Sequence, residues 1–326
     1  MYWVLYALII AIAIFAGLYF YNPRALFHHT IDLMRRLTGF QRKTLNVDGE
    51  QWYYLEGGAS DSAVMVLVHG FGANKESWLP YARLLTSKYR VIIPDVPGFG
   101  ESPQIMDKDY RSKTQADRLN AFLNRIGIDH CHISGNSMGG LIAARYTIAY
   151  PEQVDTLTLF NNAGIDAKKQ TPFYEQMLGG EATLVIRTRE EFQQLLSVVS
   201  HRPMKVPARF LDVIAEESIE RAPLLDRIFA SLKEEIMDDY LNQYLPDIRV
   251  PTLVLWGRQD KIFDYGLVNV MVEQIPDSHG VILESTGHTP MIERPADTAR
   301  HQLHFLETRA LSAGKTDTLA GLTNDA

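Results

Sequence analysis

The stretch Gly135-Asn136-Ser137-Met138-Gly139-Gly140 decides the fold of this chain. It follows the short run 130–134, which is expected to be a strand, and precedes the helix-like segment 141–150. A strand, a tight turn and a helix in this order form a nucleophile elbow, in which glycines avoid collisions between neighbouring side chains and the serine hydroxyl points outward. A G-x-S-x-G pattern alone occurs often by chance, so it is this context that makes Ser137 the candidate nucleophile.

Short β-rich runs alternate with helix-like stretches on both sides of this motif. The run Val64-Met65-Val66-Leu67-Val68 is apolar throughout, as expected of a strand that is covered on both faces. The alternation predicts an α/β fold with a mostly parallel central sheet. The predicted strands are residues 51–56, 63–68, 90–94, 130–134, 154–160, 252–256 and 280–284.

A serine nucleophile needs a base within hydrogen-bond reach and an acid that orients the base. In folds with a nucleophile elbow, the acid and then the base follow the serine in the sequence. Each of them lies on a loop after a strand. His288 lies in a turn of small residues, 285–287, directly after the last apolar run. We therefore expect His288 to be the base.

The acid is expected in the loop after the run 252–256, where Asp260 follows Gly257. An aspartate in this setting can also be a turn residue or a helix N-cap. Asp264 lies four residues later, and Asp166 follows the preceding core strand, so both are alternatives. The order and the loop position favour Asp260.

Tetrahedral intermediates need hydrogen-bond donors that point at the oxyanion, usually two backbone N–H groups. Met138 directly follows the nucleophile and supplies one of them. The second is expected from Phe71, in the loop His69-Gly70-Phe71-Gly72 after the strand 63–68. We expect His69 to shape this loop through local hydrogen bonds and to take no part in the chemistry.

Composition excludes several classes of protein. A chain of 326 residues suits one catalytic domain with an insertion. The formal charge of −7 disfavours nucleic acid as a partner, because binding phosphates requires clustered Lys and Arg. The single cysteine, Cys131, excludes an internal disulfide framework and is expected in a strand.

The N-terminus has the composition of a membrane segment. Residues 2–21 carry no charge and are largely apolar, with Tyr2, Trp3 and Tyr6 at one end and Tyr19 and Tyr21 at the other. At about 1.5 Å per residue this stretch matches a hydrocarbon core of roughly 30 Å, so residues 1–22 are predicted to be a transmembrane helix and a single-pass anchor. A cleaved signal peptide is the alternative, but no Lys or Arg precedes the apolar run.

Residues 23–43 are predicted to form an amphipathic juxtamembrane helix, because apolar residues recur at roughly helical spacing among basic ones. Such a helix could lie in the membrane interface, pair with a second copy or pack on the catalytic body. Gly17 and several alanines in the apolar segment would allow close helix approach, which suggests a homodimer. The basic residues after the span favour a cytoplasmic catalytic domain only weakly.

The alternation of strand-like and helix-like runs stops in the stretch 166–247. Apolar residues recur there at helical spacing, which predicts a helical lid or cap. Its apolar stripe could pack on the core, or some of its side chains could line an acyl tunnel over Ser137. The examples are Phe192, Leu195, Leu196, Val199, Phe210, Leu211 and Ile214. The catalytic core is then divided into 44–165 and 248–310, and the tail 311–326 has the composition of a disordered segment.

Across residues 44–309 the chain resembles the α/β-hydrolase fold serine hydrolases. The resemblance rests on these motifs: His69-Gly70-Phe71-Gly72, Asp95-Val96-Pro97-Gly98-Phe99-Gly100, the elbow at 135–140, Gly257-Arg258-Gln259-Asp260 and Gly287-His288. Within that family it most resembles membrane-anchored monoacylglycerol lipases and bacterial inner-membrane phospholipases A. That narrower resemblance rests on the N-terminal segment and the insertion.

The resemblance implies hydrolysis of a medium or long acyl ester of glycerol or glycerophospholipid, without metal or organic cofactor. It also implies a location in a membrane, the inner membrane if the source is bacterial. Two alternatives remain open: hydrolysis of a carbon–carbon bond in a ring-cleavage product, and lipid binding by a pseudoenzyme. A membrane anchor is unexpected for the first, and the second would not require every catalytic group.

Overall fold

One sheet forms the centre of the molecule. The computed structural model describes residues 2–166, 169–180, 183–202, 205–308 and 316–319. Within these residues the strand order is β1-β2-β4-β3-β5-β6-β7-β8-β9. The pairs β1–β2 and β2–β4 are antiparallel and the other neighbours are parallel, so the predicted mostly parallel α/β sheet is confirmed.

The strand bounds agree with the runs predicted from the sequence, with two additions, β1 and β9. The strands are β1 (Phe40–Val47), β2 (Glu50–Gly57), β3 (Val64–Val68), β4 (Arg90–Pro94), β5 (Cys131–Asn136), β6 (Val154–Phe160), β7 (Thr252–Gly257), β8 (Ser278–Leu283) and β9 (Thr316–Leu319). Strand β1 was not predicted. Only its end residues, Phe40 and Val47, are buried, so this edge strand lacks the continuous apolar run of the central strands.

Helices cover both faces of the sheet. Every residue of β5, β7 and β8 is buried, as two covered faces require. One core cluster joins the sheet to α4, α5 and α10, and a second joins its other face to α3 and α12. The bounds are η1 (Lys75–Trp78), α3 (Leu79–Ala82), α4 (Ser112–Arg125), α5 (Met138–Ala149), η2 (Pro151–Gln153), α10 (Leu267–Gln274), α11 (Pro290–Glu293) and α12 (Pro295–Thr308).

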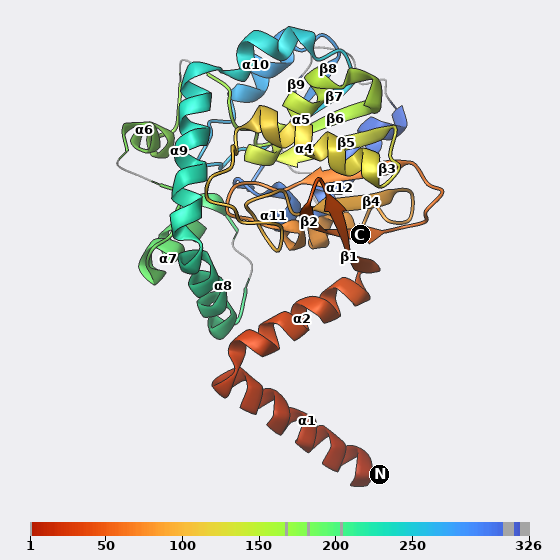
Figure 1. Cartoon of the computed structure of the whole chain (residues 1–326), viewed down its shortest axis with the longest axis vertical. Coiled ribbons are helices and arrows are strands. Elements are labelled where there is room, and N and C mark those ends of the chain that lie inside the picture. The colour runs from red at the N-terminus through yellow and green to blue at the C-terminus, as the bar shows by residue number, and fades with distance from the viewer. Residues whose placement is uncertain (1, 167–168, 181–182, 203–204, 309–315, 320–326) are drawn as a thin grey trace.

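The segment between β6 and β7 is helical in its described part. Its elements are α6 (Pro172–Gly179), α7 (Arg189–Val199), α8 (Ala208–Glu220), α9 (Ala222–Asp238) and η3 (Leu241–Asp247). Figure 1 shows these helices gathered on one side of the sheet, with the long α9 running alongside it. The insertion therefore lies where it can cover a site at the edge of the sheet.

Two helices precede the sheet: α1 (Tyr2–Tyr21) and α2 (Pro23–Leu37). Figure 1 shows α1 projecting away from the catalytic body. In the described part of the chain, no helix combines the length and the apolar character needed to cross a membrane. The transmembrane helix predicted for residues 1–22 is therefore not supported by the structure.

Helix α2 is shorter than the juxtamembrane helix predicted for residues 23–43. It ends at Leu37, and Gly39 then adopts a positive φ of 79° that directs the chain into β1. Residues 40–43 are therefore strand. Arg24 of α2 forms an ion pair with Glu220 of α8 at 2.7 Å, and Leu26 is buried, so α2 packs on the body.

The predicted disordered tail, 311–326, lies largely outside the described residues. Its described part, Thr316–Leu319, differs from the prediction because it forms β9 and pairs with β8. Backbone hydrogen bonding to an open sheet edge gives this polar segment a strand conformation that its composition does not indicate.

Candidate active site

The elbow is as tight as the sequence predicts. Strand β5 ends at Asn136, α5 begins at Met138, and Ser137 between them has a positive φ of 56°. A Cβ on Gly139 would lie 2.2 Å from the backbone oxygen of Val68, and one on Gly135 would lie 2.1 Å from that of Gly139. Only glycine fits at these two positions, because the colliding atoms belong to the backbone.

Hydrogen bonds hold the elbow and tie it to the loop of His288. The N–H of Ser137 donates to the backbone oxygen of Phe160 at 3.0 Å. The side-chain amide of Asn136 donates to the backbone oxygens of Phe160 and His288, both at 3.1 Å. The residue before the predicted nucleophile thus contacts the predicted base.

Asp260 and His288, predicted as acid and base, lie together. The Nδ1 of His288 lies 2.8 Å from Oδ2 of Asp260. The other carboxylate oxygen accepts the N–H groups of Ile262 at 2.7 Å and Phe263 at 3.2 Å. Both side chains are buried. In the part of the chain that the structure describes, His288 Nε2 has no hydrogen-bond partner, which leaves it available to accept a proton.

The two alternative acids have other surroundings. Asp264 accepts the N–H of Gly266 at 2.8 Å and pairs with Lys169 at 3.2 Å. Asp166 is exposed, and its backbone bonds to the side chain of Asn242. The structure therefore brings Asp260, and neither alternative, to His288.

Asn161 is part of the site and was missed in the sequence. Its side-chain amide donates to Oδ2 of Asp260 at 2.7 Å, the oxygen that faces His288. Asn161 follows β6 and has a positive φ of 45°, which asparagine tolerates better than most residues. An asparagine directly after a buried strand was the available signal, but only tertiary contact with Asp260 gives it meaning.

Both predicted oxyanion donors lie near Ser137. A Cβ on Gly70 would lie 3.3 Å from the Ser137 Cβ, so the loop of Phe71 packs directly on the elbow. Phe71 and Met138 line the same pocket as Ser137. Within the described residues the backbone N–H groups of Phe71 and Met138 have no protein partner, which leaves both available to an oxyanion.

His69 stabilises the loop, as predicted. Its Nε2 accepts the N–H of Val96 at 3.2 Å, and its Nδ1 then donates to the backbone oxygen of Gly70 at 2.9 Å. A ring nitrogen that accepts a hydrogen bond carries no proton, so the ring is neutral, and burial lowers the pKa of His69 in the same sense. It joins the loops after β3 and β4 and does not face the pocket.

A buried charge network supports the same two loops. Lys75 Nζ lies 2.6 Å from both Asp95 Oδ2 and Glu101 Oε2, and the backbone N–H of Lys75 donates to Asp95 at 2.8 Å. Burial opposes the charge of Glu101, but hydrogen bonds from Arg42 and Lys75 outweigh it and lower its pKa to about 2. Arg35 of α2 also forms an ion pair with Glu76, the residue next to Lys75.

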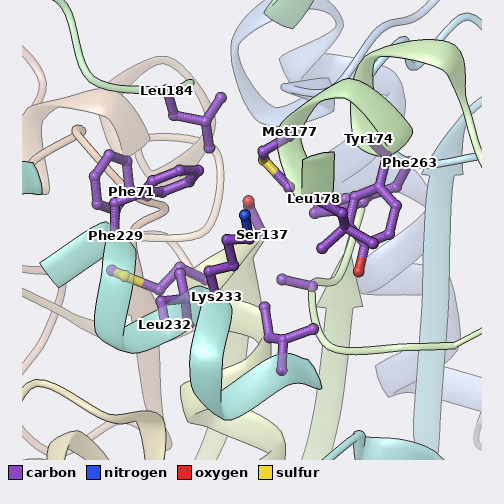
Figure 2. Close-up of a pocket in the computed structure, with 13 residues that line it drawn as sticks. Phe71, Ser137, Tyr174, Met177, Leu178, Leu184, Phe229, Leu232, Lys233 and Phe263 are labelled. Atoms are coloured by element: carbon purple, nitrogen blue, oxygen red, sulfur yellow. The ribbon is translucent and has the colours of Figure 1, made fainter. Parts of the chain in front are cut away.

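An apolar pocket lies against Ser137, and Figure 2 shows its lining. The lining comes from the elbow, α6, α9 and loops: Phe71, Ser137, Met138, Ala163, Tyr174, Met177, Leu178, Leu184, Phe229, Leu232, Lys233, Ile236 and Phe263.

The apolar cap residues named from the sequence have another role. Phe192 packs with Leu195, Leu196, Leu211 and Ile214 in a separate small cluster of α7 and α8. None of the seven lines the pocket at Ser137, so that pocket gives no support to the acyl-tunnel hypothesis for these side chains. Phe192, Leu196 and Leu211 line a separate pocket between α7 and α8. Helical spacing identifies an apolar face, but not the surface that this face covers.

The chain matches a family model described as alpha/beta hydrolase fold over residues 63–295. It is 33% identical to Lipase 1 of Psychrobacter immobilis, over 84% of this chain and 87% of that one. It is 27% identical to Monoacylglycerol lipase ABHD6 of Mus musculus, over 92% of both chains.

The chain is also similar to the crystal structure of a membrane phospholipase A, described as a bacterial virulence factor. It has 36% identity and a TM-score of 0.85, and the match covers 96% of this chain and all of that one. The family match, the similar sequences and the similar structure all agree with the nucleophile elbow and the sheet topology described above. The chain belongs to the α/β hydrolase fold family.

Proposed function

We propose that this chain is a serine hydrolase that cleaves acyl esters of glycerol lipids, with Ser137 as nucleophile, His288 as base and Asp260 as orienting acid. One observation carries the proposal. The hydrogen-bonded Asp260–His288 pair is tied through Asn136 to an elbow serine that opens into an apolar pocket. Such an arrangement suits nucleophilic attack on a substrate with an acyl chain.

The reaction follows from this geometry in two steps. Ser137 Oγ attacks the ester carbonyl carbon while His288 Nε2 takes the hydroxyl proton, and the N–H groups of Phe71 and Met138 stabilise the oxyanion. The ester C–O bond breaks, and the leaving alcohol receives the proton from His288. Water then attacks the acyl-enzyme by the same route and releases the fatty acid. Asp260 stabilises the imidazolium in both steps.

The pocket lining and the relatives support lipid esters as substrates. Nearly all lining side chains are apolar, so an acyl chain can leave water there and pack against apolar groups. The similar proteins are named as a lipase, a monoacylglycerol lipase and a membrane phospholipase A. Monoacylglycerols, lysophospholipids and phospholipids are therefore the classes to test. No specific observation favours a ring-cleavage product or a pseudoenzyme.

The enzyme works at a membrane surface in this proposal. Most of the large apolar side chains that are exposed in the described residues belong to α1 and α2. Phe20 is 62% exposed and Leu37 is 76% exposed. Exposed apolar surface of this extent is typical of a contact with lipid or protein. Since α1 leads directly into α2, which packs on the body, lipid contact there would hold the pocket near its substrate.

Replacing Ser137 by Ala tests the chemistry. Purified Ser137→Ala should lose hydrolysis of monoacylglycerol and lysophospholipid and should no longer react with a fluorophosphonate probe. Ser197→Ala, a change at an exposed serine of α7, is the control and should keep both. Full lipid hydrolysis by Ser137→Ala would overturn the proposal. Probe labelling of Ser137 with turnover of a ring-cleavage product alone would favour the carbon–carbon hydrolase.

Vesicle flotation tests the membrane contact. The double variant Phe20→Glu/Leu37→Glu should float less with phospholipid vesicles than the wild type, because charge opposes burial in lipid. Ile105→Glu/Met106→Glu changes two exposed apolar residues elsewhere and should behave like the wild type. Equal flotation of both double variants would contradict a contact through α1 and α2.

The homodimer is part of the same proposal and has its own test. A Cβ on Gly17 would meet no atom within 4 Å in the single chain. Gly17→Leu therefore fits within one copy, but its side chain would block close approach of a second α1. Crosslinking in membranes should give less dimer for this variant; an unchanged pattern would argue against helix pairing at this position.

A further inference from the structure

One charged side chain lines the apolar pocket. Of the thirteen lining residues only Lys233 carries a full charge, and Ser137 and Tyr174 are the only others with polar side-chain groups. Lys233 belongs to α9, between Leu232 and the lining residue Ile236. Figure 2 shows its side chain extending from α9 into the pocket toward Ser137.

No acidic side chain of the described residues pairs with Lys233. Glu235, two positions along α9, is buried and occupied, since it accepts the N–H of Ser112 at 2.7 Å and its hydroxyl at 2.5 Å. By contrast, Lys75 is matched by Asp95 at 2.6 Å and Lys113 by Asp239 at 2.8 Å. An ammonium group beside apolar side chains loses hydration and is stabilised by an anionic partner.

The pocket offers two kinds of contact. Acyl methylenes are best placed against its apolar side chains, such as Met177 and Leu178 of α6. The head group, which is polar, is best placed beside the cation. In a glycerophospholipid only the glycerol carbons separate the scissile ester from the phosphate. A cation that lines the pocket of the nucleophile is therefore suitably placed for that phosphate.

We propose that Lys233 binds the head-group phosphate of the substrate and makes the enzyme select phosphate-bearing acylglycerols over neutral ones. This inference rests on the proposed lipid esterase function and assigns its specificity to one side chain. Lysine is a compact point charge with three donors and is a common phosphate ligand. Selection arises because a neutral acylglycerol leaves the ammonium unpaired, whereas a phosphate pairs with it.

The test compares two substrates with the same acyl chain, a 1-acylglycerol and a 1-acylglycerol 3-phosphate. For each enzyme the ratio of kcat/KM for the phosphate ester to kcat/KM for the neutral ester is measured at one salt concentration. Lys233→Met should lower this ratio at least tenfold, mainly through KM of the phosphate ester. Lys233→Arg should restore most of it, and Lys233→Glu should lower it further.

Arg227→Met is the matched control. It removes a cation from the same helix at an exposed residue outside the pocket, so it reports any effect of net charge. Its ratio should equal that of the wild type. Fluorophosphonate labelling of Ser137 in each variant verifies that the site is folded before the ratios are compared.

Three results would overturn the inference. The first is an unchanged ratio in Lys233→Met. The second is an equal fall of kcat on both substrates, which would assign Lys233 to the oxyanion. The third is that Lys233→Met only relieves inhibition by free fatty acid, which would assign Lys233 to the product carboxylate. Wild-type enzyme that labels at Ser137 but cleaves no lipid ester refutes the proposed function itself, which keeps the two failures distinct.

Discussion

Asp260 holds His288 with one carboxylate oxygen, 2.8 Å from Nδ1, and anchors itself with the other through the N–H groups of Ile262 and Phe263. Asn161 donates to the oxygen that faces His288 at 2.7 Å. All acceptor directions of the carboxylate are therefore occupied. This fixes the orientation of the imidazole relative to Ser137.

Asp260→Asn keeps the shape of this side chain but removes the charge that stabilises the imidazolium and the tautomer. We expect kcat to fall by about 10³–10⁴-fold, while the fold is retained. Asp264→Asn, at the aspartate that pairs with Lys169, is the control and should change kcat little. Steady-state kinetics on one lipid ester measure both. A larger loss for Asp264→Asn would reassign the acid.

Gly139→Ala should destroy the elbow. The added Cβ would lie 2.2 and 2.4 Å from the backbone oxygens of Val68 and His69, and a backbone cannot move aside as a flexible side chain can. We expect loss of both fluorophosphonate labelling and thermal stability. Gly179→Ala in α6 meets nothing within 4 Å and should retain both. Normal labelling of Gly139→Ala would show that the elbow tolerates a side chain.

Lys75→Met should destabilise the fold strongly. It leaves the fully buried carboxylate of Asp95 without its cation, and breaking a buried pair in this way costs about 3–5 kcal/mol of unfolding free energy. Lys88→Met removes an exposed lysine paired with Glu307 and should leave that free energy nearly unchanged. Urea unfolding followed by circular dichroism compares them. Similar midpoints for both variants would contradict a structural role for the network.

His301 should make stability depend on pH. Burial, assisted by the charge of Arg300, lowers the pKa of His301 from 6.5 to about 4. Below pH 6.5 the unfolded chain binds a proton that the folded chain does not bind, so the free energy of unfolding should fall as pH decreases from 6.5 to about 4. Above pH 6.5 this contribution to the pH dependence vanishes.

His301→Gln should flatten this part of the pH profile, whereas His304→Gln, at an exposed histidine of the same helix, should not. Urea midpoints at several pH values between 4 and 7 provide the measurement. Identical slopes for the wild type and His301→Gln would show that other groups cause the dependence.

The sequence was sufficient for the sheet and the elbow because both depend on local pattern. Continuous apolar runs such as 64–68 can be satisfied only in covered strands, and the glycines around Ser137 are required by the turn itself. The order of Ser137, Asp260 and His288 likewise followed from strand and loop positions. Strand β1 was missed because this edge strand is buried only at its two ends and lacks that apolar signal.

Tertiary structure decided everything that depends on which distant residues meet. Asp260 and Asp264 lie in the same loop, and only packing shows that the first contacts His288 while the second contacts Lys169. Asn161 and Lys75 acquire their roles in the same way, from partners that the sheet brings together.

The sequence indicated part of the cap, and the tertiary structure decided which helices line the pocket. Periodicity identified apolar faces on the cap helices, but the fold turned α7 and α8 toward each other and gave the lining over Ser137 to α6 and α9. The sequence by itself therefore determined the fold class and the position of the candidate nucleophile, since local sterics and strand burial depend on neighbouring residues. Only the tertiary structure showed which candidate acid contacts His288 and placed Lys233 in the pocket, because these contacts join segments that are distant in the sequence.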